Sequence, residues 1–177
     1  KREFCTPRCK KINQCKAKGN AGFLRSVLAP LFQRMIRAEW GSEATGYKIA
    51  VKNNRIVSVH RHRGQCVCIT CGSIYAWDSG IKGMHTGHFA ASRRNSILLL
   101  EDNVAPQCAG CNFYRDGAPV EFRLWMETVR GEQVIDRILK LKTESVTFST
   151  DELVDRWFEY SLRLKAAKER MKRLHET

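Results

Sequence analysis

The sequence predicts an α+β fold in which a small zinc-stabilised core is flanked by helices. Two Cys-x2-Cys pairs, Cys68/Cys71 and Cys108/Cys111, bracket a segment long enough to hold its own secondary structure. Each pair spans a tight turn that points two thiolates at one metal ion, as in structural zinc sites. Apolar residues recur at helical spacing on both sides of this core, and an alternating stretch precedes it.

These patterns divide the chain into four segments. In order, they are a basic, cysteine-bearing element at residues 1–20, a helix and β-hairpin at 21–64, the zinc-stabilised core at 65–118 and a helical region at 119–177. Residues 21–40 follow a helical period, and Pro30 is expected to kink or break that helix. Residues 47–62 alternate around Asn53-Asn54, a pair typical of the turn of a β-hairpin.

The last segment is expected to be helical. Residues 121–129 and 131–142 have the periodicity of two short helices, broken at the glycine that begins the second. Ser149 and Glu152 form an S-x-x-E capping box, which predicts a helix from that point to about Leu174.

The charge of the chain indicates a polyanionic partner. The chain has 31 Lys and Arg residues against 18 Asp and Glu residues, for a net charge of +13. An anionic membrane is less suitable than nucleic acid, because the basic residues are spread along the chain and no apolar run is long enough to span a bilayer. We therefore expect DNA binding and no membrane contact. The closely grouped cysteines indicate a reducing cytoplasm with zinc.

The eight cysteines favour zinc over disulfides. An even number would also suit a secreted disulfide scaffold, but the chain is long, shows no signal peptide and groups its cysteines closely. The two Cys-x2-Cys pairs supply the four thiolates of a closed tetrahedral site. Cys66 could substitute in that site, although the two-residue spacing favours Cys68 and Cys71. Zinc alone does not define a function, since such sites also stabilise inert treble-clef-like folds.

The segment between the cysteine pairs contains the residues of a ββα-metal (HNH) nuclease core. In that arrangement a hairpin and one helix hold a general base and a divalent cation at the scissile phosphate. Residues 84–89 are expected to form the first strand, with His88 as the base, and residues 97–100 the second strand. Asn103 would then fix the hairpin through backbone hydrogen bonds. Asn112 would bind Mg²⁺ or Mn²⁺ at the start of the helix, facing His88 across the ion.

Each of these residues also has a simpler interpretation. A single histidine in a strand is commonly a packed or surface side chain, and asparagine is common in turns for its backbone preference. The joint order and spacing inside one zinc frame favour a nuclease over a non-catalytic zinc-stabilised DNA-binding module. A zinc-ribbon component of a larger nucleoprotein assembly would explain the charge and the cysteines, but it would leave the histidines and Asn112 without a role.

The stretch CITCGSIYAWDSGIKGMHTGHF, followed by EDNVAPQCAGCN, resembles the NinG family of phage recombination proteins, called Rap in phage lambda. The family pattern runs C-x-x-C-G, then D-x-G-H-[YF], then N-x-H-x-Q-C-x-x-C-N. FCTPRCKK resembles the family's amino-terminal zinc element, and EFRLWMETVRGEQVIDRI resembles its helical stretch after the core. The resemblance covers most of the chain and is weakest over residues 20–65.

The resemblance implies a structure-specific DNA endonuclease that acts on branched recombination intermediates, such as Holliday junctions and D-loops, in the host-cell cytoplasm. It implies that the paired cysteines bind structural zinc, that His88 is the base and that Asn112 binds the catalytic cation. His85 takes the place of the family's Asp and is a further candidate ligand for that cation. Cys5 and Cys9 match half of a second zinc site, whose first pair would precede residue 1.

Two positions depart from the expected patterns. Gly87 precedes His88, where many HNH enzymes carry Asp or His, although the Gly-His pair agrees with the NinG pattern. Ala105 stands where that pattern has His, which predicts slower cleavage, or loss of cleavage with DNA binding retained. The second departure is the main support for the binding-module alternative.

Four arginines are candidate DNA contacts. Arg93 and Arg94 follow the first predicted strand and could hold the scissile or a neighbouring phosphate, although an exposed basic loop has the same composition. Arg61 and Arg63 could also contact phosphate or form the solvated end of a strand. Two symmetrical nicks across a junction need two active sites, so we expect a homodimer. The amphipathic helix after Ser149 is a candidate contact, although it could equally pack on the chain's own core.

Overall fold

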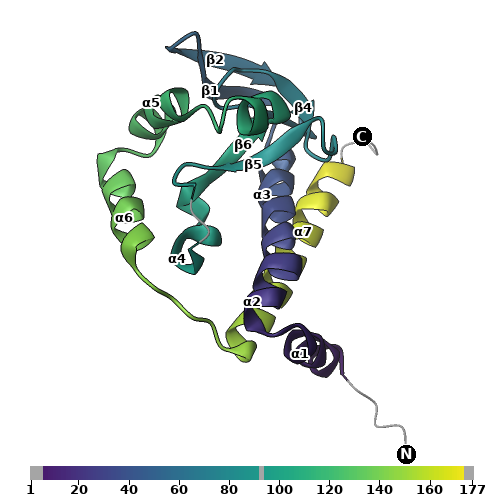
Figure 1. Ribbon diagram of the computed structural model, residues 1–177. Coiled ribbons are helices and arrows are strands. Elements are labelled where there is room, and N and C mark those ends of the chain that lie inside the picture. The colour runs from purple at the N-terminus through teal and green to yellow at the C-terminus, as the bar shows by residue number, and fades with distance from the viewer. Residues whose placement is uncertain (1–5, 92–93, 174–177) are drawn as a thin grey trace, which may run out of the picture.

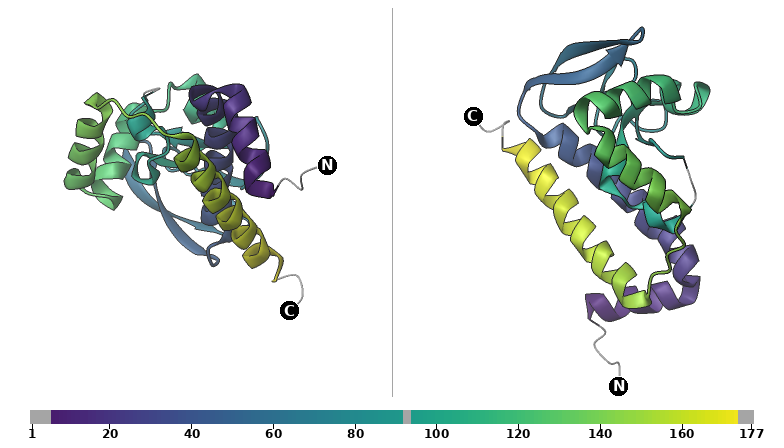
Figure 2. Two further views of the ribbon diagram at one scale, coloured as in Figure 1. Left: turned by 90° about the horizontal axis from the view of Figure 1, so that it is seen from below. Right: turned by 90° about the vertical axis from the view of Figure 1, so that its left-hand side faces the viewer.

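Two long helices form the spine of the fold. Helix α3 (Ala29–Ser42) and helix α7 (Thr150–Lys172) lie side by side and run in the same direction (Figure 1 and Figure 2). The computed structural model describes residues 6–91 and 94–173. Within these residues the helices are combined with small antiparallel two-stranded sheets, so the fold is α+β as predicted.

The other elements are short. In chain order, they are helices α1 (Pro7–Lys18) and α2 (Asn20–Phe23), the π-helical turn η1 (Leu24–Leu28), strands β1 (Gly46–Lys52), β2 (Arg55–Arg61), β3 (Gln65–Val67), β4 (Ile74–Ala76) and β5 (Met84–His88), helix α4 (Asn95–Leu98), the 3-10 turn η2 (Glu101–Asn103), strand β6 (Val104–Cys108), the π-helical turn η3 (Gly110–Tyr114), and helices α5 (Pro119–Val129) and α6 (Glu132–Thr143). Strand β1 pairs with β2, β3 with β4, and β5 with β6. None of the helices in the described part of the chain is long and apolar enough to cross a membrane.

The helix expected over residues 21–40 is present, but Pro30 does not break it. The π-helical turn η1 leads directly into α3, and Pro30 lies in the first turn of α3. Because proline has no N–H to donate, a carbonyl one turn earlier loses its α-helical partner, and a π-type turn accommodates that loss. Phe23, Leu28 and Phe32 project from this helical rod and are fully buried.

Helix α7 packs its apolar face onto α3. Leu153, Tyr160 and Leu164 belong to the same buried cluster as Phe32, and the ring centroids of Phe32 and Tyr160 lie 5.3 Å apart. This face is therefore used within the chain, and the homodimer stays a prediction.

Arg163 fastens α7 to the rest of the fold. Its guanidinium donates to both carboxylate oxygens of Glu39 in α3, at 2.9 and 2.8 Å, and to both of Glu101 in η2, at 2.5 and 2.9 Å. These hydrogen bonds raise the pKa of Arg163 above its ordinary value. Since η2 leads into β6, the same contacts hold the start of that strand against the helical layer.

Three local motifs form as their sequences predict. Asn53 and Asn54 have positive φ angles of 51° and 56° and connect β1 to β2 in a tight hairpin. Gly131, at φ 83°, separates α5 from α6. Ser149 caps α7: its side chain accepts from the N–H of Glu152, and the Glu152 carboxylate accepts from the N–H of Ser149.

The second strand predicted for the core is wrong. Residues 97–100 lie at and just after the end of α4, and the strand that pairs with β5 is β6. A short apolar run fits a helical turn as well as a buried strand. Here Ile97 and Leu99 pack into two different buried clusters, whereas in a strand both side chains would share one face.

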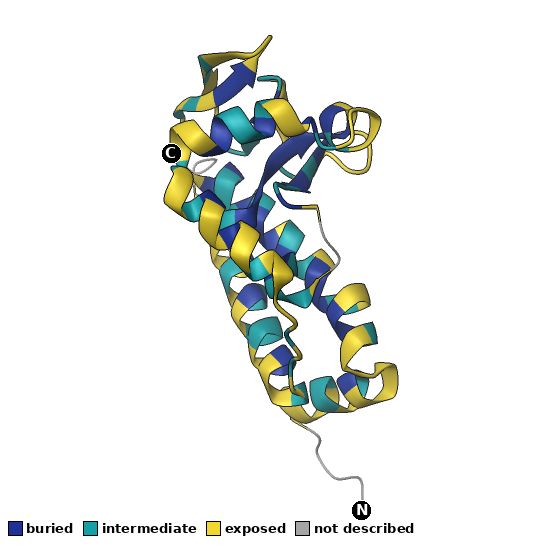
Figure 3. Cartoon of the chain, turned by 60° about the vertical axis from the view of Figure 1, so that its left-hand side comes forward, coloured by how far each residue is buried: buried dark blue, intermediate teal, exposed yellow. Residues whose placement is uncertain are grey.

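The β5–β6 pair lies in the interior of the molecule. Every residue of β6 and three residues of β5 are buried, and Figure 3 shows buried strands among helices whose outer faces are exposed. Among the described residues, β5 pairs with β6 only, so its other edge carries no neighbouring strand. That edge is where the candidate site opens.

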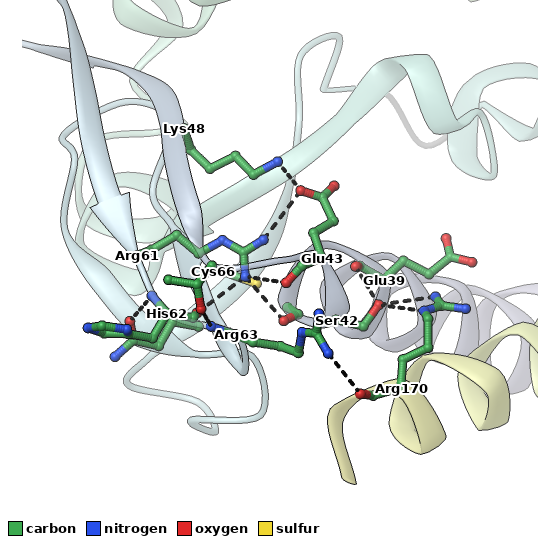
Figure 4. Close-up of polar contacts among 12 residues, drawn as sticks. Glu39, Ser42, Glu43, Lys48, Arg61, His62, Arg63, Cys66 and Arg170 are labelled. Atoms are coloured by element: carbon green, nitrogen blue, oxygen red, sulfur yellow. Dashed lines mark hydrogen bonds and ion pairs between the residues drawn. The ribbon is translucent and has the colours of Figure 1, made fainter. Parts of the chain in front are cut away.

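The structure corrects the prediction that Arg61 contacts DNA. Its side chain is 1% exposed and donates to the carbonyl oxygens of Gly41, Glu43 and His62, at 3.2, 3.1 and 3.2 Å (Figure 4). It also pairs with the Glu43 carboxylate at 3.3 Å. A guanidinium buried among these acceptors secures the end of α3 and cannot reach a DNA backbone.

Candidate metal centre and adjoining cavity

Four cysteine side chains converge at one point of the fold. The Sγ atoms of Cys68, Cys71, Cys108 and Cys111 all lie within 4.8 Å of one another, and those of Cys71 and Cys108 are 3.7 Å apart. Four Zn–S bonds of about 2.3 Å in a tetrahedron place the sulfur atoms about 3.8 Å apart. The cluster could therefore hold a zinc ion with little rearrangement, as the spacing of the two pairs predicts.

Two tight turns bring these cysteines together. The first pair lies between β3 and β4, where Gly72, at φ 77°, closes the turn and its N–H donates to the Cys68 carbonyl at 2.9 Å. The second pair joins the end of β6 to η3, and the N–H of Cys111 donates to Cys108 Sγ at 3.4 Å. The cluster thereby clamps the β3–β4 turn onto β6 and η3.

Hydrogen bonds inside the cluster favour the thiolate form of three cysteines. The close approach of the other three sulfur atoms raises the pKa of Cys68, and the contact with Cys68 lowers the pKa of Cys71 to about 4 and that of Cys108 to about 6. The same thiol lowers the pKa of Cys111. Because zinc binds thiolates, this distribution of charge suits a cation.

The other described cysteines stay outside this cluster. Cys66 is buried and donates through Sγ to the carbonyl of Arg37 at 3.3 Å, and burial raises its pKa to about 12. Cys9 is exposed on α1, whereas Cys15 is buried in the helical core. Cys5 lies outside the described residues, and within those residues no second cluster of His, Cys, Asp or Glu ligands forms. The second zinc site stays a prediction.

A polar cavity of about 700 Å³ opens along the unpaired edge of β5. His85, His88 and Asn112 all line it, so the structure brings these three predicted site residues together. A second cavity, of about 610 Å³, shares His88 and Asn112 with the first. Asn112 reaches both cavities because it directly follows Cys111 in η3, whose start is held by the cysteine cluster.

His85 is held in one tautomer and faces Asn112. Its Nε2 contacts the carbonyl of Ile81 at 2.7 Å, and since a carbonyl only accepts, Nε2 carries the proton. Its Nδ1 therefore has a free lone pair, which accepts a hydrogen bond from Asn112 Nδ2 at 3.3 Å. A half-turn of the amide would bring Asn112 Oδ1 to that position. An imidazole nitrogen and an amide oxygen would then converge, as two ligands of one divalent cation do.

His88 is oriented by the short helix α4. Its Nε2 donates to the carbonyl of Leu98 at 3.3 Å, which leaves Nδ1 as the nitrogen that can accept a proton. Burial lowers the pKa of His88 below its ordinary value, against the opposing effect of the Leu98 carbonyl. The imidazole is therefore neutral at physiological pH, the state that a general base requires.

Asn103 makes the backbone hydrogen bonds expected of it, although it precedes β6 instead of following a strand at residues 97–100. Its Oδ1 accepts from the N–H of Ala90 at 2.8 Å. Its Nδ2 donates to the carbonyls of Ala90 and Ile97, at 3.3 and 3.1 Å. These contacts join the end of β5 to α4, the helix that orients His88.

The departures at Gly87 and Ala105 have structural explanations. A Cβ atom at Gly87 would lie 1.9 Å from Gln107 Oε1, so this position requires glycine. Gln107 is fully buried, and its Nε2 donates to Thr70 Oγ1 at 3.1 Å and to the carbonyl of Gly117 at 2.7 Å. Ala105, opposite Gly87 in the ladder, is buried and lines neither cavity. Gln107 is a supporting residue that our sequence-based assignment of the site missed.

The basic residues that line the larger cavity are not the predicted ones. Arg34 and Arg37, from α3, lie in its wall. Arg94 is exposed before α4, Arg93 lies outside the described residues, and Arg63 is half-buried and hydrogen-bonded to the end of α7. The three-residue spacing of Arg34 and Arg37 marks one face of a helix, but no local pattern shows that this face meets β5.

The chain matches the family model described as "Bacteriophage Lambda NinG protein" over residues 45–170. The matched region contains the cysteine cluster, His85, His88 and Asn112, and it begins after α3. No curated protein and no solved structure matches the chain.

Substitution of a cluster cysteine is expected to remove zinc. Wild-type protein should contain one zinc ion per chain, whereas Cys111→Ser should lose it, measured by atomic absorption. Structural zinc contributes several kcal/mol to folding, so the melting temperature of Cys111→Ser should fall by about 10 °C or more.

Cys66→Ser is the matched control, because Cys66 is also buried next to the cluster but contributes no ligand. It should retain its zinc. Wild-type zinc content in Cys111→Ser would contradict the assignment.

Proposed function

The chain belongs to the family of the bacteriophage Lambda NinG protein, which points to a role in phage recombination, and from this premise we propose that it is a metal-dependent DNA endonuclease of the ββα-metal (HNH) type. Its proposed substrates are branched recombination intermediates such as Holliday junctions and D-loops. The observation that carries the proposal is the shared cavity of His85, His88 and Asn112 beside a cysteine cluster that could hold zinc.

In this proposal His85 Nδ1 and Asn112 Oδ1 hold a divalent cation, Mg²⁺ or Mn²⁺. When bound, the cation supplies stabilisation of the charge that develops on the phosphate and on the leaving oxygen. A mixed nitrogen and oxygen donor set suits Mn²⁺ better than Mg²⁺, which prefers oxygen ligands alone. Phe113, whose ring centroid lies 5.0 Å from that of His85, supports the imidazole from the side.

His88 takes the proton of the attacking water at Nδ1. The water oxygen forms a bond to phosphorus, the bond from phosphorus to the 3′-oxygen breaks, and the leaving oxygen takes a proton from solvent. The hydrogen bond from Nε2 to the Leu98 carbonyl keeps the ring in the required tautomer and stabilises the imidazolium that forms.

Exposed apolar side chains at the cavity support a branched substrate. Phe113 and Tyr114 directly follow Asn112 and are 60% and 88% exposed, and Ile81, in the lining of the same cavity, is 81% exposed. Aromatic side chains next to a phosphate-binding site can stack on exposed base faces, which the single strand of a D-loop and the centre of an open junction offer and intact duplex does not. The net charge of +13 supports binding to the backbones of the arms.

A non-catalytic DNA-binding module of the same family is the second candidate function. The observation that favours it is Ala105, because the histidine of the family pattern is replaced by a buried methyl group. Under this alternative, DNA binding would persist without cleavage.

The His88→Ala substitution separates the two candidates. Loss of a general base lowers catalysis by about 10²–10⁴-fold, so nicking of a four-way junction in Mn²⁺ or Mg²⁺ should become nearly undetectable while junction binding persists. His60→Ala, at an exposed position on β2, is the matched control and should cleave at the wild-type rate. Equal absence of cleavage in all three proteins would favour the binding module.

The acid limb of the pH profile should report His88. Neutral His88 is present above its pKa, and burial lowers that pKa. A nearby divalent cation would lower the pKa of His88 further, so the direction of the pKa shift stays the same. The value of kcat/KM should therefore stay on its plateau down to about pH 6.5, the ordinary histidine pKa, and fall only below it. A midpoint above about 7, with zinc content constant across the series, would contradict this role for His88.

Removal of the exposed aromatic side chains should weaken discrimination between substrates. The double variant Phe113→Ala/Tyr114→Ala should lose about tenfold in affinity for a four-way junction but little for linear duplex, since stacking contributes about 1–3 kcal/mol per base. Competition binding with the two DNAs measures the ratio. Equal loss on both substrates would show that these side chains do not recognise the branch.

A further inference from the structure

Arg37 carries a positive charge into the wall of the larger cavity, where the described residues provide no carboxylate as an ion-pair partner. Its Nε donates to the carbonyl of Trp77 and its Nη1 to Thr86 Oγ1, both at 3.3 Å. Both acceptors are neutral. Thr86 in turn donates to the carbonyl of Gln33 at 2.8 Å, so its hydroxyl is fixed as an acceptor toward Arg37.

This pairing differs from that of three other arginines packed against the core. Arg61 pairs with Glu43, Arg130 with Asp102, and Arg163 with Glu39 and Glu101. Asp78 lines the same cavity and attracts Arg37 electrostatically, but the two form no ion pair. Partial burial lowers the pKa of Arg37. A cation that is partly desolvated without a charged partner is unfavourable unless an anion binds beside it.

The position of Arg37 is tied to the candidate site. Thr86 lies on β5 between His85 and His88, so the hydrogen bond to Thr86 holds the guanidinium in the cavity that both histidines line. Nη2 makes no hydrogen bond to a described residue, and it is not among the polar atoms that are fully buried without a partner. The N–H groups of Nη2 therefore remain able to donate to phosphate oxygens.

Arg34 extends the same surface. It lies three residues before Arg37, on the same face of α3, and is exposed at the cavity. Its guanidinium carbon lies 6.0 Å from the centre of the Trp77 ring, an arrangement that leaves its N–H groups available to a ligand.

We propose that Arg37 binds a phosphodiester of the DNA strand at the site, and that Arg34 binds a neighbouring phosphate of the same strand. This inference rests on the proposed function for its substrate class. It assigns phosphate binding to α3, which lies outside the region matched to the family. Arg37 is thereby a positioning residue that holds the phosphate between the base and the cation ligands.

Salt dependence of DNA binding tests this proposal. Removal of one arginine that neutralises a duplex phosphate should make the slope of log K against log salt less negative by about 0.9. Arg37→Gln and Arg34→Gln, each in the His88→Ala background so that the four-way junction is not cut, should both show this change. Loss of a charged hydrogen bond should also weaken affinity at low salt about tenfold.

Two further variants exclude trivial explanations. Lys140→Gln, on an exposed position of α6 that lines neither cavity, removes the same charge and should leave the slope unchanged. Arg37→Lys should keep the wild-type slope but bind less tightly, because it retains the charge and loses the guanidinium N–H groups. A purely structural role for Arg37 would instead lower the melting temperature of Arg37→Gln without altering the slope.

The outcomes separate this inference from the proposed function. Unchanged slopes in Arg37→Gln and Arg34→Gln overturn it, even if wild-type protein cleaves DNA. Less negative slopes in both variants support phosphate binding by Arg37 and Arg34, even if wild-type protein proves inert as a nuclease. If Arg37→Gln does not fold, the slope of the exposed Arg34→Gln variant decides whether this face of α3 binds phosphate.

Discussion

The convergence of four cysteine sulfur atoms is the constraint on which the candidate site depends. A two-stranded sheet is marginal by itself, and the β5–β6 pair has no further strand among the described residues to support it. The cluster clamps the β3–β4 turn onto the end of β6 and the start of η3. Asn112 directly follows Cys111, so this cluster, and not a large core, holds it next to His85.

The opposite wall of the cavity is positioned by packing of a different kind. Helix α3 is part of the long helical rod that α7 covers, and Arg163 holds α7 against both α3 and η2. Asn103 then joins β5 to α4, which orients His88. The cysteine cluster and a helical layer thus meet along the free edge of β5, and the cavity they enclose combines His85, Asn112, a neutral His88 and the positive charge of Arg37. In the function we propose, that combination would bind a phosphodiester together with a divalent cation.

Features set by neighbouring residues could be predicted from the sequence, and features set by distant packing could not. The Cys-x2-Cys pairs, the Asn53-Asn54 turn and the Ser149 capping box each carry their geometry within a few residues, and the structure contains all of them. The strand predicted at residues 97–100 is wrong, because a short apolar run does not show which clusters it will join. Arg61 and Arg37 have the same side chain, but one is buried among carbonyls and the other lines a cavity. Arg37 lines the cavity because α3 packs beside β5, and this contact between distant segments cannot be predicted from the local sequence.

Pulsed electron paramagnetic resonance of zinc-loaded protein titrated with Mn²⁺ tests the central claim most directly. The account predicts one bound Mn²⁺ per chain, with nuclear coupling to a single imidazole nitrogen that disappears in His85→Ala and survives in His60→Ala. Absence of bound Mn²⁺, or a nitrogen coupling that persists without the imidazole at position 85, would contradict the assignment of this cavity as a cation site.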